Sequence, residues 1–320
     1  MGARGARSPS GLAPATKRPV GGRHRVKSRE RVASEGGDGG YNTRLNLPAG
    51  SAATLKSGPM PELLSEAGGA VHRLTLNRPA RRNALTPDLA RAIVEQLDLV
   101  EESGQAEVVV LRGSGGHFCA GLDLHWLRGL GESPSIADLQ RGLGDFQAAV
   151  LAIVRCPVPV LAVVEGTAAG FGLDLALACD LRLAGADATF TSAFARMGLV
   201  PDGGSTFTLP RLVGIGPALR LLLAGETIDA TRAQAIGLVD EVVQTGAMDD
   251  EVAALVQRLT AGAASSVRAI KRLVRAQEVG ALEQVLSAEG AAQLQALQGP
   301  EFHRRLEAFA ARLAARAEGA

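Results

Sequence analysis

Two glycine-rich stretches say most about the fold: HFCAGLDL at residues 117–124 and GTAAGFGLDLALACD at residues 166–180. Both follow apolar runs typical of buried strands. The first places Gly121 where the backbone must bend sharply, and the second bends at glycine and continues into helical periodicity. Backbone N–H groups at the start of a helix lack an internal partner and lie at the positive end of its dipole. Two such turns facing one atom predict an oxyanion hole. For the first stretch, a tight turn that uses Gly121 and leads into a helix capped by Asp123 is the alternative interpretation.

The surrounding sequence alternates short apolar runs with helical periodicity, which indicates an α/β fold with a parallel sheet and crossover helices. A helix at Asp88–Glu102 is preceded by Thr86 and Pro87, a cap and a first-turn residue. Strands are predicted at residues 71–76, 108–111, 158–164 and 181–184. The C-terminal third is predicted to be mostly helical, at residues 217–223, 231–235, 249–260, 265–275, 282–297 and 300–317.

The start of the chain differs from the rest in charge and composition. Residues 1–60 carry 11 Lys or Arg against 3 Asp or Glu, a balance of +8, and residues 61–320 carry 23 against 30, a balance of −7. Because the basic segment is rich in Gly, Pro and Ser and lacks periodic apolar positions, we expect residues 1–59 to form a disordered extension. An extension with no part in the chemistry is the favoured interpretation, and a transit peptide or a nucleic-acid-binding arm are the alternatives.

The bulk properties of the 320-residue chain narrow the class of protein. Apolar residues make up 46% and charged residues 21%, which is typical of a soluble globular protein. The longest apolar runs, such as Val158–Val164, are much shorter than the roughly 18 residues that a membrane span requires. Cys119, Cys156 and Cys179 form neither a CxxC pair nor an even set, which favours a reducing cytoplasm and predicts no metal site.

Taken together, these motifs resemble those of the enoyl-CoA hydratase/isomerase family, the crotonases. The signature of that family is FCAGxDL followed by a Gly-rich strand-to-helix stretch that ends in LALACD, and both occur here. The resemblance covers about residues 68–318 and implies a spiral of ββα units at residues 60–260, then a helical region at residues 261–320 that usually trimerises. Further matches are LNRPARRNAL at 76–85, GLVPDGG at 198–204, LPRLVG at 209–214, ATRAQAIGLVDEV at 230–242 and AIKRL at 269–273.

The resemblance also implies where an acyl-CoA thioester binds. By position, the backbone N–H groups of Leu122 and Phe171 are the two oxyanion donors, and Phe171 stands where many relatives have Gly. The large ring of Phe171 is expected to narrow the pocket or to redirect the acyl chain. The substrate-binding residues expected around these donors are Ala120, Gly121, Asp123, Gly170, Gly172, Phe194 and Arg82.

Double-bond isomerisation is expected rather than hydration. Hydratases of this family place two glutamates around a water, and here those positions hold Asp174 and Phe194, whose ring cannot position a water. Asp202 occupies the position of the working aspartate in dienoyl-CoA isomerases and in the isomerases of phenylacetate breakdown, which the local sequence especially resembles. Its apolar neighbours should raise its pKa, as acid–base catalysis needs, although an aspartate that merely caps the turn is the alternative.

We therefore predict that Asp202 removes a carbon proton and returns it elsewhere, with Asp174 assisting. A hydratase that tolerates Phe194, a hydrolytic or dehalogenase-like enzyme, and a non-catalytic acyl-CoA-binding relative or scaffold stay open. The expected partner is an acyl-CoA thioester, without nucleic acid or membrane, and the expected assembly is a homotrimer or hexamer. No cofactor is expected, because coenzyme A is part of the substrate. Residues Arg128–Leu143 are predicted to be mobile and to shape the acyl pocket.

Overall fold

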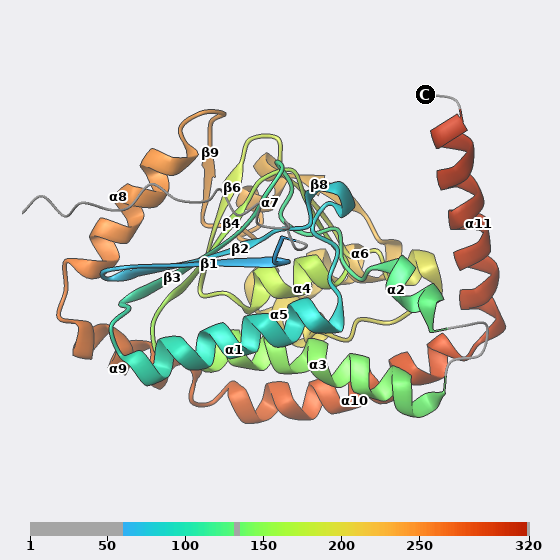
Figure 1. Cartoon of the computed structure of the whole chain (residues 1–320), viewed down its shortest axis with the longest axis horizontal. Coiled ribbons are helices and arrows are strands. Elements are labelled where there is room, and N and C mark those ends of the chain that lie inside the picture. Colours follow the sequence, from blue (N-terminus) through green and yellow to red (C-terminus); the bar gives the residue numbers. More distant parts are fainter. Residues whose placement is uncertain (1–59, 131–134, 319–320) are drawn as a thin grey trace, which may run out of the picture. The chain divides into compact units, whose positions relative to one another are not determined.

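The computed structural model describes residues 60–130 and 135–318, so the predicted disordered extension at residues 1–59 lies outside the described residues. The described part is an α/β structure with a six-stranded sheet and a three-stranded sheet (Figure 1). The larger sheet has the order β1 Leu63–Gly68, β2 Val71–Leu76, β3 Val108–Gly113, β4 Val160–Val164, β6 Leu181–Gly185 and β9 Glu241–Val243. The smaller sheet has the order β5 Thr167–Ala169, β7 Thr189–Thr191 and β8 Thr227–Asp229.

The larger sheet is parallel except at one edge, where β1 and β2 form an antiparallel hairpin. Strand β3 pairs with β4 in the register Val109 to Val160, so the carboxyl ends of these two strands lie at the same edge of the sheet. In open parallel sheets that edge is where ligands bind, because the turns that leave neighbouring strands meet there. Each of the two glycine-rich stretches follows one of these strands.

The two faces of the larger sheet are both covered, as a parallel sheet requires. Val109 and Leu111 of β3 belong to the main core, on the side packed by α1, α3 and α4. Their neighbours Val108 and Val110 point to the opposite face, where α8 contributes Met248. This two-residue alternation explains why Val108–Leu111 are all apolar: each side chain packs against a helix on one face of the sheet or the other.

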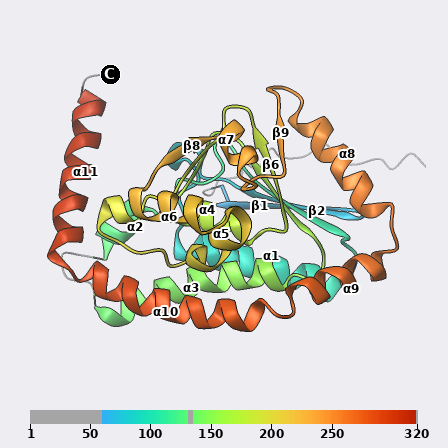
Figure 2. The ribbon, with the colours of Figure 1, turned by 180° about the vertical axis from the view of Figure 1, so that it is seen from behind.

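Helices α1, α3 and α10 lie side by side along one face of the larger sheet, and Figure 2 shows α4, α5 and α6 from behind. The helices of the described residues are α1 Pro87–Ser103, α2 Leu124–Gly129, α3 Ile136–Arg155, α4 Phe171–Ala178, α5 Ser205–Val213, α6 Ile215–Ala224, α7 Ala230–Ala235, α8 Met248–Thr260, α9 Ala264–Arg275, α10 Val279–Leu297 and α11 Pro300–Glu318, with short 3-10 helices η1 Pro79–Arg81 and η2 Ala195–Met197.

The predicted α/β class, the four predicted strands and the predicted helices are confirmed, with helix starts within three residues of the expected ones. The cap of α1 forms as expected, since the Thr86 hydroxyl accepts from the Leu89 N–H at 3.2 Å. Five short strands, β1, β5, β7, β8 and β9, and the helices α2, α3 and α5 were not predicted. Most of those strands are three residues long, too short for a periodic pattern to stand out.

The segment Arg128–Leu143, which was predicted to be mobile, is helical from Ile136 onward, where α3 begins with Ser135 as its cap. This helix was not predicted because its sequence contains Gly142 and Gly144, and glycine is unfavourable inside a helix. Gly142 has a packing reason to be there: a β-carbon on it would lie 2.6 Å from the Trp126 ring. The absent side chain lets α2 pack closely on α3.

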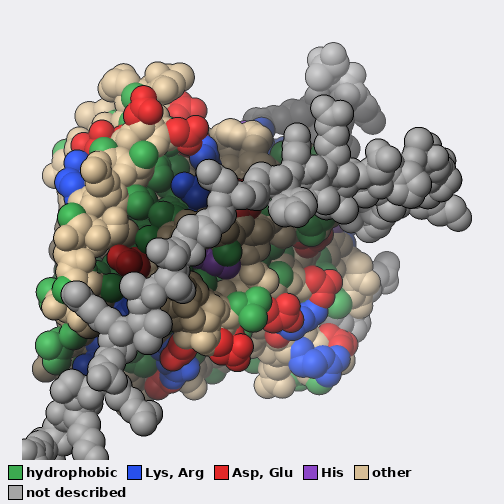
Figure 3. All heavy atoms as spheres, turned by 60° about the vertical axis from the view of Figure 1, so that its left-hand side comes forward, with side chains coloured by type: hydrophobic (Ala, Val, Ile, Leu, Met, Phe, Trp, Pro, Cys, Tyr) green, Lys and Arg blue, Asp and Glu red, His purple; other side chains and the backbone are tan. Residues whose placement is uncertain are grey.

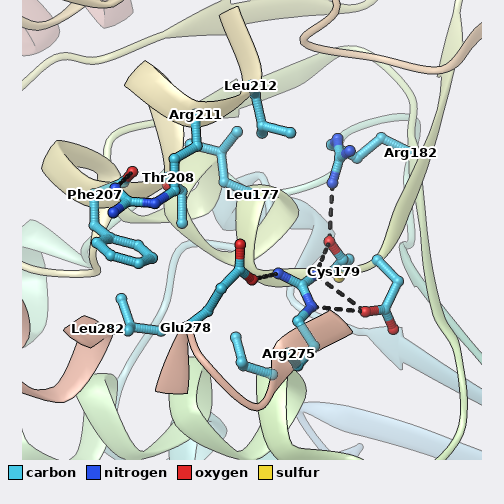
Figure 4. A pocket seen from close by; sticks show the side chains of 12 residues that line it. Leu177, Cys179, Arg182, Phe207, Thr208, Arg211, Leu212, Arg275, Glu278 and Leu282 are labelled. Carbon is cyan, nitrogen blue, oxygen red and sulfur yellow. Dashed lines mark hydrogen bonds and ion pairs between the residues drawn. The ribbon is translucent and has the colours of Figure 1, made fainter. Parts of the chain in front are cut away.

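Helix α9 is attached to the core by a charged network that begins at the end of α4 (Figure 4). The Arg275 guanidinium donates to Asp180 Oδ1 at 3.0 and 3.2 Å and to the Glu278 carboxylate at 3.0 Å. The Cys179 carbonyl accepts both from Arg275 and from Arg182, a side chain that is only 4% exposed. This network fixes the point from which α10 runs back across α3. None of the helices in the described residues is long and apolar enough to cross a membrane.

Candidate active site

The first glycine turn is held in place by Leu85. Leu85 donates its N–H to the Gly121 carbonyl at 2.7 Å and accepts from the Asp123 N–H at 2.9 Å. Because peptide groups alternate in direction along an extended chain, the N–H of Leu122 between these two contacts points away from Leu85. Gly121 adopts φ +94°, and a β-carbon there would lie 2.7 Å from the Ala169 carbonyl oxygen, so the turn requires glycine.

The second glycine turn is the start of α4. Gly170 takes φ +51° and allows Phe171 to begin the helix with an ordinary backbone conformation. The Gly170 carbonyl accepts from Leu173 and Asp174, the first intrahelical bonds. The Phe171 N–H precedes them and has no carbonyl of its own helix to reach. Within the described residues, neither the Phe171 N–H nor the Leu122 N–H donates to a backbone acceptor.

The two turns lie against each other. Cys119 donates to the Thr167 carbonyl and accepts from the Ala169 N–H, both at 3.0 Å, which makes a parallel bridge between Cys119 and Ala168. The bridged residues Cys119 and Ala168 are 49 positions apart, the same separation as that between Leu122 and Phe171. The position of a β-carbon on Gly121 would be 3.5 Å from the Phe171 nitrogen. The two free donors therefore stand at the same end of two paired segments.

A cavity of about 650 Å³ opens at these turns. Its lining includes Asp202 together with the predicted donors, and so brings one carboxyl group to the same space as two unpaired amides. Three of the residues named from the sequence do not line it: Asp123, Gly172 and Asp174. Those that do are Arg82, Ala120, Gly121, Leu122, Gly170, Phe171, Phe194 and Asp202.

Asp202 is the acidic group of the cavity and is 7% exposed. One carboxylate oxygen, Oδ2, accepts from the Gln293 side-chain amide at 3.1 Å, and the other, Oδ1, is buried and has no hydrogen-bond partner among the described residues. Burial raises the pKa of Asp202 to about 7, against the lowering effect of the Gln293 bond, and the negative charge of Glu289 raises it further. The group can thus exchange a proton near neutral pH.

Asp174 lies behind the cavity wall, 1% exposed, in the first turn of α4. Its Oδ2 accepts from the Gly203 N–H at 3.1 Å, next to Asp202 in the chain. Burial above all, and then the charges of Glu289 and Asp202, raise the pKa of Asp174 well above its usual range. The observed contact is a hydrogen bond that anchors the loop of Asp202, and the catalytic assistance predicted for Asp174 stays a prediction.

Asp123 caps α2 and belongs to a separate ion pair. Its Oδ1 accepts from the His125 N–H at 2.8 Å, and its Oδ2 pairs with Arg78 at 2.6 Å. Burial by itself would raise the pKa of Asp123, but the Arg78 and backbone hydrogen bonds lower it, so the group is ionised. Asp123 thus supports the turn that holds Leu122, and its predicted contact with substrate stays a prediction.

The rings of Phe146 and Phe171 form an apolar wall of the cavity, with centroids 5.4 Å apart. Phe171 is 3% exposed, so most of its ring is packed inside the protein. Phe146 was not foreseen, because α3 was not. Arg196 of η2 and Arg305 of α11 also line the cavity, and Arg305 donates to the Arg196 carbonyl at 3.0 Å.

Gln293 of α10 was also missed, although the sequence held a signal for it. The inward-facing stripe of α10 contains Leu282, Leu286, Glu289 and Gln293, so two polar residues occupy positions where the helical period calls for apolar ones. Glu289 and Gln293 are 6% and 2% exposed. Polar groups buried in this way need hydrogen-bond partners, and both find them in the loop that carries Asp202.

Comparison with known proteins bears on this arrangement. The family model described as "Enoyl-CoA hydratase/isomerase" matches residues 66–319. A probable enoyl-CoA hydratase from Rhodobacter capsulatus is 35% identical over 236 residues, which are 74% of this chain and 90% of that protein. The 1,2-epoxyphenylacetyl-CoA isomerase of Escherichia coli K12 is 32% identical over 254 residues, 79% of this chain and 97% of that protein.

Solved structures are similar as well. The crystal structure of an enoyl-CoA hydratase from Bacillus halodurans superposes with a TM-score of 0.74 at 26% sequence identity, over 78% of this chain and all of that one. This likeness confirms the crotonase-like fold expected from the motifs.

Proposed function

This chain belongs to the enoyl-CoA hydratase/isomerase family, the crotonases, and from that premise we propose that it moves a carbon–carbon double bond in an enoyl-CoA thioester. Membership makes it an acyl-CoA-processing enzyme. The single observation that carries the isomerase proposal is Asp202, a buried carboxyl whose pKa is raised to about 7, in one cavity with two unpaired backbone amides.

The proposed reaction passes through an enolate. The thioester oxygen accepts from the N–H groups of Leu122 and Phe171, which makes the proton on the carbon next to the thioester more acidic. Asp202 Oδ1 takes that proton from C2 of a 3-enoyl thioester, and the electron pair spreads over the oxygen and C4. Protonated Asp202 returns the proton to C4, which gives the 2-enoyl thioester and restores the carboxylate. The reaction consumes no water and needs no cofactor beyond the coenzyme A of the substrate.

Hydration is the second candidate, favoured by the name of the Rhodobacter relative. The residues at the cavity support isomerisation better. Phe194, which stands at one of the positions where hydratases hold a glutamate, is a buried apolar side chain that lines the cavity. Asp174 is enclosed behind the wall and is bonded to Gly203, so it does not reach a water in the cavity in this arrangement.

Incubation with 3-enoyl-CoA and 2-enoyl-CoA in deuterated water separates the two reactions. Isomerisation gives a 2-enoyl product from the 3-enoyl substrate, with deuterium at C4 where the carboxyl has exchanged its proton with solvent. Predominant formation of 3-hydroxyacyl-CoA would refute the isomerase proposal. The rate should also fall as pH drops through about 7, because the base form of Asp202 is required.

Asp202→Asn tests the role of the carboxyl itself. We expect turnover to fall by about a thousandfold, since removal of an acid–base group costs roughly 10² to 10⁴ in rate. Asp98→Asn, on the exposed side of α1, is the matched control and should leave turnover unchanged. Unchanged turnover in Asp202→Asn would instead favour a different catalytic group, and intact CoA binding with no turnover in the wild type would favour a non-catalytic relative.

We also propose that the chain assembles as a homotrimer or hexamer. Hydrophobic side chains are exposed among charged ones on the side of the molecule that carries α8 (Figure 3). On α9, Ile270, Leu273 and Val274 are 62%, 71% and 65% exposed. Contiguous exposed apolar residues of this kind are typical of protein interfaces. Sedimentation equilibrium of the full chain measures the assembly, and a monomer at micromolar concentration would contradict it.

A further inference from the structure

Helix α10 carries a polar pair that faces the loop of Asp202. Glu289 accepts from the Gly204 N–H at 2.7 Å and from the Thr206 N–H at 3.0 Å, and so caps the start of α5 just after the loop. Gln293 lies four residues further along α10, on the same face. Both its amide oxygen and its amide nitrogen form hydrogen bonds with the loop. The acid of the cavity is therefore positioned by a residue 91 positions away in the sequence.

The orientation of the Gln293 amide follows from its two partners. Its Oε1 lies 3.1 Å from the Val200 nitrogen, and because a backbone N–H can only donate, the atom facing it must be the oxygen. The NH₂ group is thereby turned toward Asp202 Oδ2, which it reaches at 3.1 Å. One oxygen of the carboxyl is held, and Oδ1 is the oxygen left without a partner among the described residues.

We propose that Gln293 is a positioning residue for Asp202: it holds Oδ2 and so makes Oδ1 the atom that carries the proton. This inference rests on the proposed role of Asp202 as acid and base. A carboxylate with one oxygen fixed cannot rotate its two oxygens into the same place, so the proton leaves and returns through one atom. The hydrogen bond from Gln293 stabilises the ionised form of Asp202. It therefore lowers the pKa of Asp202, whereas burial raises it.

Other charged groups face the same loop and must stay in place during a test. Glu289 on α10 and Asp174 on α4 make the electrostatic potential at the loop more negative. Two cationic side chains, Arg196 of η2 and Arg305 of α11, also line the cavity. A suitable variant changes none of these four. Gln293→Met meets that condition, because it keeps the length of the side chain and removes both polar ends.

Gln147 of α3 provides a matched control. Its Nε2 donates to the backbone carbonyl of Asp202 at 3.1 Å and to that of Leu286 at 2.8 Å, so it anchors the same loop without touching the carboxyl group. Gln147→Met therefore loosens the loop to a similar degree and leaves the partner of Oδ2 in place. The comparison separates an effect on the acid from a general effect on the loop.

The experiment titrates each variant in two ways: by the pH–rate profile, and by the infrared carbonyl band of the protonated Asp202, identified by its loss in Asp202→Asn. In Gln293→Met both midpoints should rise by about one pH unit, because a hydrogen bond to the ionised form is lost. We expect kcat at pH 7 to fall about tenfold with KM within twofold. Gln147→Met should lower kcat by less than about threefold with no change of midpoint.

Gln293→Glu is a second variant, to be used if Gln293→Met does not fold. It keeps an oxygen for the Val200 N–H and replaces the donor by a second carboxyl, so the two acids share a proton and the midpoint should rise as well. Midpoints equal to wild type in both folded variants would overturn the positioning role. A second outcome would overturn the proposed function instead: the infrared midpoint shifts in the Gln293 variants, but Asp202→Asn retains full turnover. The contact between Gln293 and Asp202 would then still be supported.

Discussion

The two halves of the candidate site are built in different ways. The donor half consists of backbone N–H groups at Leu122 and Phe171, set by paired turns at the edge of the larger sheet. The acid half is one side chain, Asp202, on a loop that is tied to α10 by Gln293 and to α4 by Asp174. The first half depends on glycine at the bend, and the second depends on the identity of several distant side chains.

The difference has a consequence for how such a site changes. A backbone N–H does not depend on the side chain of its own residue: the Phe171 N–H is unpaired in the described part of the chain although a large ring stands at this position, and Gly170 takes the positive φ of the turn. A carboxyl in a buried loop depends on every partner, since each unpaired polar atom in a low-dielectric space costs free energy. Reaction type should therefore vary through the acid half while thioester binding stays with the donor half.

The largest effect that tests this contrast concerns stability. The pKa of Asp202 rises from 3.8 to about 7 on folding, so the native state keeps its proton to higher pH than the unfolded state does. Stability associated with this group is therefore present below pH 4 and is lost as pH rises through 7. Asp202→Asn should stabilise the protein by up to about 4 kcal/mol above pH 7 and by little below pH 4.

Chemical denaturation at a series of pH values measures this difference in the free energy of unfolding. Asp98→Asn, at an exposed position of α1, is the control and should give a small difference at every pH. A variant at position 202 that is less stable than wild type at pH 8 would mean that the acid half is not strained by its burial, and the contrast between the two halves would lose its main support.

The second effect tests the donor half at its bend. A β-carbon on Gly121 would meet the Ala169 carbonyl at 2.7 Å in a backbone conformation that L-residues rarely adopt, so Gly121→Ala must displace the turn. We expect kcat to fall by about a hundredfold or more, the usual cost of losing an oxyanion donor. Gly116→Ala is the matched control, with a similar φ of +73° but open space around its β-carbon.

Gly116→Ala should thus show the cost of backbone strain alone, about 1 kcal/mol of stability, with turnover close to wild type. If Gly121→Ala retained wild-type kcat, the Leu122 N–H would not be a donor to the reacting oxygen. Steady-state kinetics together with thermal unfolding of both variants distinguishes a displaced donor from an unstable protein.

The third effect concerns the tie between α10 and the loop. Glu289→Gln keeps one oxygen for Thr206 but turns an NH₂ group toward the Gly204 N–H, so two donors face each other in a buried place. We expect a loss of about 2 kcal/mol in the free energy of unfolding. Glu283→Gln, which breaks an exposed ion pair of the same helix with Arg155, should cost less than about 1 kcal/mol by the same denaturant titration.

The contrast also explains what the sequence could foretell. Both glycine turns could be predicted, because a turn that needs positive φ requires glycine, and a glycine directly after an apolar strand is recognisable within one short stretch, as at Gly121. The family motifs added Asp202. The supports of Asp202 were harder to predict. Glu289 and Gln293 could be recognised as polar residues in the inward-facing stripe of α10, but nothing in that stripe names Asp202 as the partner of Gln293. Helix α3, which carries Gln147, contains glycines that weaken a helical prediction.

The smallest expected effect is that of Leu122→Ala. If its amide and not its side chain acts on the thioester, Leu122→Ala should lower kcat by no more than about threefold, since the backbone donor is retained. Leu122→Pro replaces that N–H by a ring carbon and fixes φ at position 122, and should lower kcat by about a hundredfold. The pair is informative because both variants lose the same leucine side chain from the cavity wall. Equal rates in two folded variants would show that the Leu122 amide does not act on the thioester. If both rates were also well below wild type, the donor half would depend on side-chain identity as the acid half does.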